Sequence, residues 1–255
     1  MIRVEIEAAV HTITLDAPAV RNAFDESMIS DLIDGIRAAA ADPGCRALLI
    51  TGAGHTFCAG RNLTKAADDD LGAMLDREGL WEEVFQELHR STTPSVAVVE
   101  GYAVAGGFTL AMGCDFVVAD SGAVFGAYEM RNGFPAAVNT PLLAKLVPPR
   151  MALEWAMMGQ PIPARRLYEL GLVNRLADGA AELATVRATF VADLVALEAE
   201  AVALTLELHR AARNLPLSDA LTMGKQQNTL IAASGLLDRA MRRFAEKKKP
   251  ATRRD

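Results

Sequence analysis

The segment of residues 101–115 reads GYAVAGGFTLAMGCD. Three glycines and two alanines fall within its first seven positions, and an apolar run follows that ends on Asp115. Bare backbone between two hydrophobic runs is typical of a tight loop that opens a helix, where unpaired N–H groups can approach a ligand closely. The segment therefore predicts a helix from about Gly106, with a binding site at the start of that helix.

The sequence on both sides of this segment alternates between strand and helix patterns. Strands are expected over 2–7, 11–16, 47–51, 95–100, 115–119 and 123–125, and helices over 26–41 and 71–90. Asp25 is expected to cap the first of these helices, because its carboxylate can accept a hydrogen bond from the first turn. Strands that alternate with helices predict an α/β fold with mostly parallel strands.

The pattern changes after residue 178. Alanine- and leucine-rich helical periodicity runs over 178–210 and 217–247 without a strand signal. The chain is therefore expected to consist of an α/β core over 1–190 and a helical C-terminal region over 191–255.

Composition excludes several classes of protein. The net charge of -6 argues against a dedicated nucleic-acid binder. Three cysteines without a CxxC pair predict reduced thiols and a cytoplasmic location. The N-terminal residues alternate like a strand rather than a signal peptide, and Glu100 and Asp115 interrupt the most apolar stretch, so no membrane span is expected. The four histidines are scattered, and no metal is expected.

A second glycine-rich loop, GAGHTFCAGRNL, covers residues 52–63 and also follows a buried strand. It is not a dinucleotide-binding loop, since Phe57 stands where the third glycine of GxGxxG is needed. Both loops could be simple tight turns. Alternatively, an N–H group from each could meet at one oxygen, and such an oxyanion hole is worth about 10²–10³ in rate per donor.

Three segments together resemble the signature segments of the crotonase family, also called the enoyl-CoA hydratase/isomerase family. They are FCAGRNL (57–63), the segment 101–115, and FGAYEMRNGFPAA (125–137). The resemblance extends over nearly the whole chain, including the turn RNAF (21–24) and the tail AMRRFAEKKKP (240–250). It implies a spiral of ββα units whose helical C-terminal region mediates assembly into trimers or pairs of trimers. It also implies an acyl-CoA thioester substrate and no separate cofactor, since coenzyme A is part of the substrate.

The resemblance assigns roles at the two loops and at two further positions. It implies that the backbone N–H groups of Arg61 and Gly106 form the oxyanion hole. Two-carboxylate hydratases of the family carry one glutamate at the position of Thr109 and another at the position of Glu129. This chain keeps Glu129, which is expected to be the sole acid/base, whereas Thr109 either holds a water molecule or is a passive helix residue.

The resemblance further implies substrate and coenzyme A contacts at positions around the loops and in the tail. These are Arg21, Ala23, Ala59, Gly60, Asn62, Leu63, Gly107, Tyr128, Arg131, Phe134, Pro135, Phe244 and Lys247. Arg21 is expected to replace a lysine that the family often carries in its first coenzyme A segment. The tail from Arg242 has seven basic residues against two acids, which suits a nucleotide phosphate and, more remotely, RNA or a membrane surface.

Hydration of a 2-enoyl-CoA is the first functional expectation. Three alternatives remain open: isomerisation of a double bond, which needs only one base; hydratase/lyase chemistry on a branched or dicarboxylic, glutaconyl-type acyl-CoA; and acyl-CoA binding without turnover. A dicarboxylic substrate would suit an arginine side chain, Arg61 or Arg131, that faces the acyl pocket.

Overall fold

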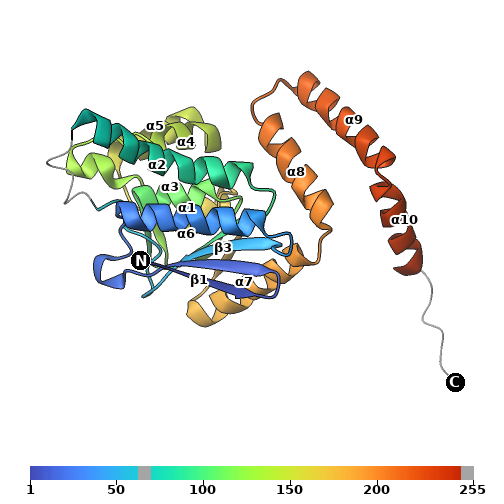
Figure 1. Cartoon of the computed structure of the whole chain (residues 1–255). Coiled ribbons are helices and arrows are strands. Elements are labelled where there is room, and N and C mark those ends of the chain that lie inside the picture. Colours follow the sequence, from blue (N-terminus) through green and yellow to red (C-terminus); the bar gives the residue numbers. More distant parts are fainter. Residues whose placement is uncertain (63–69, 248–255) are drawn as a thin grey trace. The chain divides into compact units, whose positions relative to one another are not determined.

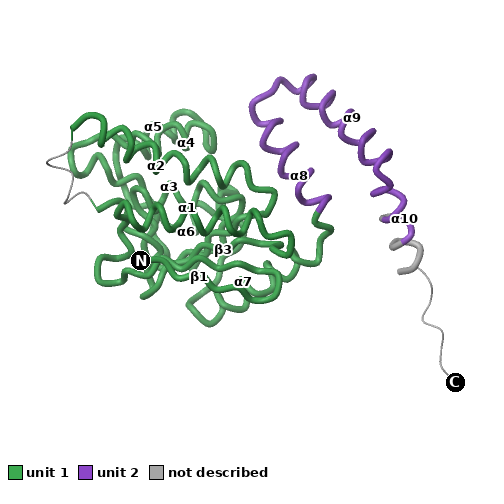
Figure 2. The backbone as a smooth tube through the Cα atoms, in the orientation of Figure 1, with its two compact units in different colours: residues 1–199 green, residues 200–255 purple. Residues whose placement is uncertain are grey.

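The structure, a computed structural model of the chain, describes residues 1–62 and 70–247, without the side chains of residues 240 and 243–247. It divides into two compact units, residues 1–199 and 200–255 (Figure 2).

A six-stranded sheet with the order β1-β2-β3-β4-β6-β9 forms the centre of the first unit (Figure 1). The strands are β1 (Ile2–Glu7), β2 (Val10–Leu15), β3 (Ala47–Gly52), β4 (Ser95–Val99), β6 (Phe116–Asp120) and β9 (Arg175–Ala177). Strands β1 and β2 are antiparallel, and all other neighbours in this sheet are parallel. The predicted α/β class and parallel strands are therefore confirmed.

A smaller sheet carries part of the glycine-rich segment. It consists of β5 (Tyr102–Val104), β7 (Val124–Gly126) and β8 (Ile162–Pro163), with β5 parallel to β7 and β7 antiparallel to β8. Strand β5 was expected to be loop, because three residues next to a glycine give no period-2 pattern. Its pairing with β7 brings the segment 101–107 next to the segment that contains Glu129.

Helices cover both faces of the large sheet. Those of the first unit are α1 (Glu26–Ala41), α2 (Leu71–Arg90), α3 (Gly106–Gly113), α4 (Asn139–Leu146), α5 (Pro149–Met158), α6 (Ala164–Glu169) and α7 (Ala180–Val195). Leu48 and Ile50 of β3 point to the core beneath α1, α2 and α3, whereas Ala47 and Leu49 point to the core beneath α7. This alternation is the period of a strand that is buried on both faces.

Helix α1 has the predicted bounds. The Asp25 carboxylate accepts a hydrogen bond from the Met28 amide at 2.9 Å, which confirms the predicted cap. Met28, Leu32 and Ile36 are buried as expected from their spacing.

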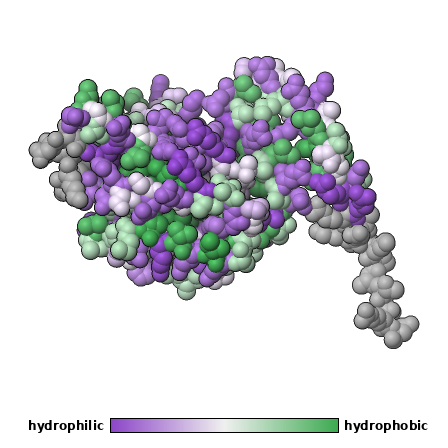
Figure 3. All heavy atoms as spheres, viewed as in Figure 1, coloured by the Kyte–Doolittle hydropathy of each residue, from purple (hydrophilic) through white to green (hydrophobic). Residues whose placement is uncertain are grey.

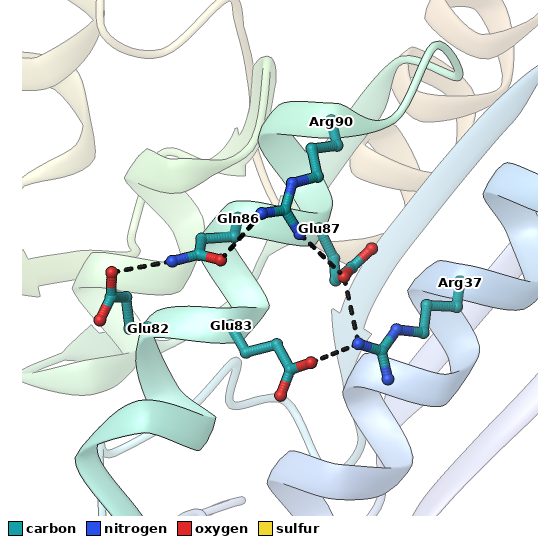
Figure 4. Close-up of polar contacts among 6 residues, drawn as sticks. All are labelled: Arg37, Glu82, Glu83, Gln86, Glu87 and Arg90. Carbon is teal, nitrogen blue, oxygen red and sulfur yellow. Dashed lines mark hydrogen bonds and ion pairs between the residues drawn. The ribbon is translucent and has the colours of Figure 1, made fainter. Parts of the chain in front are cut away.

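A network of ion pairs and hydrogen bonds connects helix α2 to α1 on its outer side (Figure 4). The Arg37 guanidinium donates to Glu83 and Glu87, and Arg90 contacts Glu87 and Gln86. Exposed ion pairs of this kind contribute little to stability. The larger contribution comes from Trp81 on the inner side, which is buried against Phe24 with ring centroids 5.0 Å apart.

Helix α7 explains why the first unit ends near residue 199 and not near residue 190. Leu183, Val191 and Leu194 are buried in one cluster with Leu49 and Val98 of the large sheet. The helix therefore belongs to the α/β unit along its whole length, although its sequence resembles that of the helices that follow.

The second unit consists of helices α8 (Ala199–Ala212), α9 (Leu217–Ala233) and α10 (Leu236–Lys247). Leu206 and Leu236 are buried. Other large apolar side chains are exposed, namely Leu217, Leu221, Leu230, Leu237 and Met241. Figure 3 shows apolar residues scattered among polar ones on the visible face. Among the described helices, none is both long and apolar enough to cross a membrane.

Candidate active site

The two glycine-rich loops meet at Gly60 and Gly106. Cys58 pairs with Ala103 in an isolated parallel bridge, so that the first loop runs alongside β5. A Cβ atom on Gly60 would lie 2.8 Å from the Ala105 Cβ and 3.2 Å from the Gly106 nitrogen. Only glycine permits this approach, which places the amide of Arg61 next to that of Gly106.

These two amides have no acceptor in the described part of the chain. The Phe24 amide donates to the Gly60 carbonyl at 2.8 Å, and the Phe24 carbonyl accepts from the Asn62 amide at 2.7 Å. The Arg61 amide lies between these two bonds and points away from Phe24. Gly106 is the first residue of α3, and the first amides of a helix have no intrahelical partner. Two adjacent unpaired N–H groups are the arrangement that an oxyanion hole requires.

Ala105 holds an unusual backbone conformation between β5 and α3. Its φ of +49° and ψ of −123° are rare for a residue with a Cβ, and such strain costs on the order of 1–3 kcal/mol. Its amide donates to the Gly126 carbonyl at 2.8 Å, and its carbonyl accepts from the Thr109 amide at 3.1 Å and from Asn139 Nδ2 at 3.0 Å. The chain turns at Ala105, and this turn aims the Gly106 amide.

Glu129 lies on the short 3₁₀ helix η3 (Tyr128–Asn132) and is half-buried. Its Oε1 accepts a hydrogen bond from Asn139 Nδ2 at 2.8 Å, whereas its buried Oε2 has no partner among the described residues. Burial raises the pKa of this carboxyl, and hydrogen bonds from its own backbone amide and from Asn139 only partly oppose that effect. Glu129 thus has one oxygen that is held and one that is available for proton transfer.

Thr109 is buried in α3 with 2% of its surface exposed. Its hydroxyl lies 2.9 Å from Asn139 Oδ1 and 3.2 Å from the Ala105 carbonyl. A hydroxyl has one proton, and the shorter contact assigns it to Asn139. Any water molecule held by Thr109, as the sequence suggested, would have to donate to the remaining lone pairs of the hydroxyl.

Asn139 is the polar residue of this cluster that sequence reasoning missed. It is completely buried at the first position of α4. An asparagine before the apolar run of a helix is usually read as an N-cap, and no motif spacing links it to Glu129. Only the fold shows that its side chain points inward.

The two arginines considered for a second substrate carboxylate are both engaged. Arg61 Nη1 lies 2.6 Å and 2.8 Å from the two carboxylate oxygens of Glu78 on α2, and the Arg61 side chain is 21% exposed. The Arg131 guanidinium stacks over the Tyr128 ring at 4.8 Å.

The side chains of Trp81 and Arg61 flank the unpaired amides. A Cβ atom on Gly106 would lie 3.4 Å from Trp81 and 3.6 Å from the Arg61 Cγ.

The turn at residues 21–24 contributes backbone and one side chain that was also missed. The Ala59 amide donates to the Arg21 carbonyl at 3.0 Å, so Arg21 and Ala23 lie beside the first loop. Buried Asn22 accepts from the Ala17 amide at 2.9 Å through Oδ1, and its Nδ2 lies 2.9 Å and 2.6 Å from the carbonyls of Ala53 and Thr56. Asn22 thereby fixes the loop that carries Arg61.

The remaining predicted residues divide into three groups. Gly107 faces the first loop, since a Cβ atom there would lie 2.3 Å from the Cys58 carbonyl oxygen. Phe134 and Pro135 follow η3, and the Phe134 amide contacts the Glu129 carbonyl at 3.4 Å. Leu63 and the side chains of Phe244 and Lys247 lie outside the described residues. In the described part of the chain, no group of histidine, cysteine or acidic side chains could hold a metal ion.

The chain is similar in sequence and in fold to several known proteins. The sequence model of the family described as enoyl-CoA hydratase/isomerase matches residues 5–254. A 2,3-dehydroadipyl-CoA hydratase of Escherichia coli K12 is 32% identical and covers 93% of this chain and 92% of its own length. A 1,2-epoxyphenylacetyl-CoA isomerase of the same organism is also 32% identical, over 72% of this chain and 74% of its own length. The crystal structure of an enoyl-CoA hydratase from Polaromonas sp. JS666 matches with a TM-score of 0.91, 30% identity and 99% coverage of both chains.

Proposed function

The chain belongs to the enoyl-CoA hydratase/isomerase family and processes acyl-CoA, and from that premise we propose that it adds water to a 2-enoyl-CoA with Glu129 as its single acid/base. The observation that carries this proposal is the buried Oε2 of Glu129, which has no partner among the described residues, in a site where the amides of Arg61 and Gly106 likewise have none there.

The proposed reaction uses these groups in two proton transfers. Glu129 Oε2 takes a proton from water, and the resulting hydroxide adds to the β-carbon of the enoyl thioester. The electron pair moves to the thioester oxygen, which accepts hydrogen bonds from the two amides. The protonated Glu129 then returns its proton to the α-carbon, so that the carboxylate is regenerated.

The raised pKa of Glu129 suits both steps. A carboxylate of ordinary pKa is a weak base near neutral pH, and burial brings the pKa closer to the working pH, where general acid–base catalysis is most efficient. Within residues 1–62 and 70–247, no charged side chain that the structure describes is hydrogen-bonded to Oε2, so this oxygen can hold the proton between the two steps.

Isomerisation is the second candidate, and it rests on the same single carboxylate. One base that takes a proton and returns it elsewhere can move a double bond, and an isomerase is among the relatives of this chain. A dicarboxylic substrate is a weaker candidate: one relative is a dehydroadipyl-CoA hydratase, but Arg61 is already paired with Glu78 in this chain.

We also propose a homotrimer or a dimer of trimers, no separate cofactor, and a cytoplasmic location. The assembly is supported by pairs of large apolar side chains that are exposed one turn apart on the same helix, namely Leu153 and Met157 on α5 and Leu217 and Leu221 on α9, since exposed apolar surface of this kind marks interaction sites. The location is supported by Cys45, Cys58 and Cys114, all of which are free and buried.

Crotonyl-CoA tests the proposal directly. Hydration removes the conjugated enoyl-thioester absorbance, and E129Q should slow this loss by about 10²–10⁴-fold while leaving the affinity for the ester unchanged. The exposed glutamate of α5 supplies the control E154Q, which should react like wild type. Turnover of a β,γ-enoyl ester without hydration of crotonyl-CoA would favour isomerisation, and full activity of E129Q would refute the assignment of the base.

A further inference from the structure

The side chain of Asn139 connects the groups to which the proposed reaction assigns separate tasks. Its amide contacts three groups on two segments: Glu129 Oε1 on η3 at 2.8 Å, and the Ala105 carbonyl at 3.0 Å and the Thr109 hydroxyl at 2.9 Å at the start of α3. A fully buried amide with three such contacts has a single available orientation.

The chemistry of the partners settles which end of the amide faces which group. The Ala105 carbonyl and the Glu129 carboxylate can only accept, so they require the two protons of Nδ2. Oδ1 then faces Thr109, whose hydroxyl donates to it. The reversed amide would place its oxygen against two other oxygens, which is unfavourable.

The contact at the Ala105 carbonyl acts on the oxyanion hole. This carbonyl and the Gly106 N–H are the two ends of one planar peptide unit, so fixing the oxygen also fixes the direction of the N–H. A hydrogen bond to the carbonyl also polarises the peptide and strengthens its N–H as a donor.

We propose that Asn139 is a positioning residue, whose amide fixes the Ala105–Gly106 peptide and the Glu129 carboxylate relative to each other and leaves Oε2 as the oxygen that transfers protons. Thr109 orients this amide through Oδ1. The proposal rests on the role of Glu129 given under the proposed function, and it places Thr109 behind Asn139 and not against the reacting water.

The titration of Glu129 reports on this arrangement. The Asn139 donor favours the charged carboxylate and lowers the pKa against the effect of burial, so its loss should raise that pKa further. The charged side chains on the neighbouring elements are Arg131 on η3, Lys145 on α4, and Arg150 and Glu154 on α5; all are exposed. Burial raises the pKa of Glu129, the two hydrogen bonds lower it in part, and none of these charges contributes to the shift.

N139L is the principal variant, because leucine has a similar shape but no donor and leaves no room for a water molecule. We expect kcat for crotonyl-CoA to fall by about 10²-fold with little change in KM, since a small misplacement of catalytic groups costs that much. The acid limb of the kcat/KM profile should move to higher pH. N139A serves as a second variant if N139L folds poorly, and folding is followed by circular dichroism and urea unfolding.

Neighbouring threonines provide the controls and a double-mutant cycle. T140A, which removes an exposed hydroxyl bonded to the Ala136 carbonyl at 2.7 Å, should match wild type. T109V should lose about tenfold in kcat, whereas T109S keeps the donor and should restore the rate. The double variant T109V/N139L should lose no more than N139L alone, because Thr109 acts through Asn139. Losses that multiply would show that Thr109 acts independently and would overturn that part of the proposal.

A measurement without turnover separates this proposal from the proposed function. The carboxyl of Glu129 can be titrated by ¹³C NMR in protein labelled with [δ-¹³C]glutamate, and its resonance is identified by its absence from E129Q. A higher pKa in N139L than in wild type supports the positioning role even if no enoyl ester is hydrated. An unchanged titration, or a wild-type kcat in N139L, overturns it.

Discussion

Asn139 donates a 2.8 Å hydrogen bond to one carboxylate oxygen of Glu129 and leaves the other buried without a partner among the described residues. The two residues are ten positions apart and come from η3 and α4, which meet only in the folded chain. The environment of the carboxylate is therefore asymmetric. One oxygen is fixed by a hydrogen bond, and the other remains available for proton transfer. Such an arrangement favours function at the expense of stability.

The free energy of unfolding should depend on pH because of the buried carboxyl of Glu129. The pKa of Glu129 is raised in the folded protein, so the carboxyl binds its proton more tightly when folded than when unfolded. The wild type should therefore lose free energy of unfolding, relative to E129Q, as the pH rises from about 4 through the folded pKa. We expect E129Q to gain on the order of 1 kcal/mol by pH 8, the scale of an unsatisfied buried acceptor.

Urea unfolding of the two proteins at pH 4 and pH 8 measures this difference. The substitution E154Q on the exposed face of α5 should show no comparable trend. A difference between E129Q and wild type that is independent of pH would mean that the carboxyl titrates alike in both states.

Gly60 should tolerate no side chain. In G60A the new Cβ would lie 2.8 Å from the Ala105 Cβ and 3.2 Å from the Gly106 nitrogen, at a φ of +98°. We expect a loss of about 2–4 kcal/mol in stability and at least about 10²-fold in kcat, since the two loops must separate.

The matched control for this substitution is G171A. Gly171 has a φ of +76°, but a Cβ added there would have nothing within 4 Å, so it carries the backbone cost of about 1 kcal/mol without the clash. Equal effects of G60A and G171A on stability and kcat would show that close approach of the loops is unimportant.

Asn22 should contribute more to the free energy of unfolding than its position in a turn suggests. N22G keeps the positive φ of +56° accessible but removes the donor to the Ala53 and Thr56 carbonyls and the acceptor for the Ala17 amide. We expect a loss of about 2–4 kcal/mol from the unsatisfied backbone groups. Urea unfolding measures it beside N132A, an exposed asparagine that should cost little. An equally small loss in N22G would mean that water replaces these bonds.

The Arg61 side chain should be dispensable for the reaction itself. R61A keeps the backbone amide, so kcat for crotonyl-CoA should stay within about tenfold of wild type. Because the guanidinium is paired with Glu78, the R61A substitution should reduce turnover of a glutaconyl-type ester no more than turnover of crotonyl-CoA.

Comparison of the two esters in R61A and E78A decides this point. In the opposite outcome, R61A would lose turnover of the dicarboxylic ester selectively, and E78A, in which the guanidinium is released, would gain it. That outcome would show that the Arg61 side chain binds a second substrate carboxylate.

The sequence predicted those elements whose pattern is local. Helix α1 has both its bounds and its Asp25 cap where periodicity and capping chemistry put them, and the α/β class follows from the alternation of strands and helices. The family was recognised from three short motifs, and the match over residues 5–254 confirms it. The assignments of Arg61, Gly106 and Glu129 stay predictions, which the geometry supports.

Elements that depend on distant partners could not be predicted. Strand β5 is defined by its pairing with β7, and α7 belongs to the first unit because its apolar face packs on the large sheet. Asn139 looks like an ordinary helix cap until α3 and η3 are placed beside it. A polar residue acquires its role here from what surrounds it, and that information is spread over thirty residues of chain between Thr109 and Asn139.

The contact between Thr109 and Asn139 also constrains how this site can change over generations. A glutamate introduced at position 109 would need the volume that the Asn139 amide fills, and would set a second carboxylate against a fully buried neighbour. A glutamate at position 109 alone should therefore be harmful. In descendants that gain such a glutamate, residue 139 should become smaller first or simultaneously, so the two positions are expected to vary as a pair across the lineage.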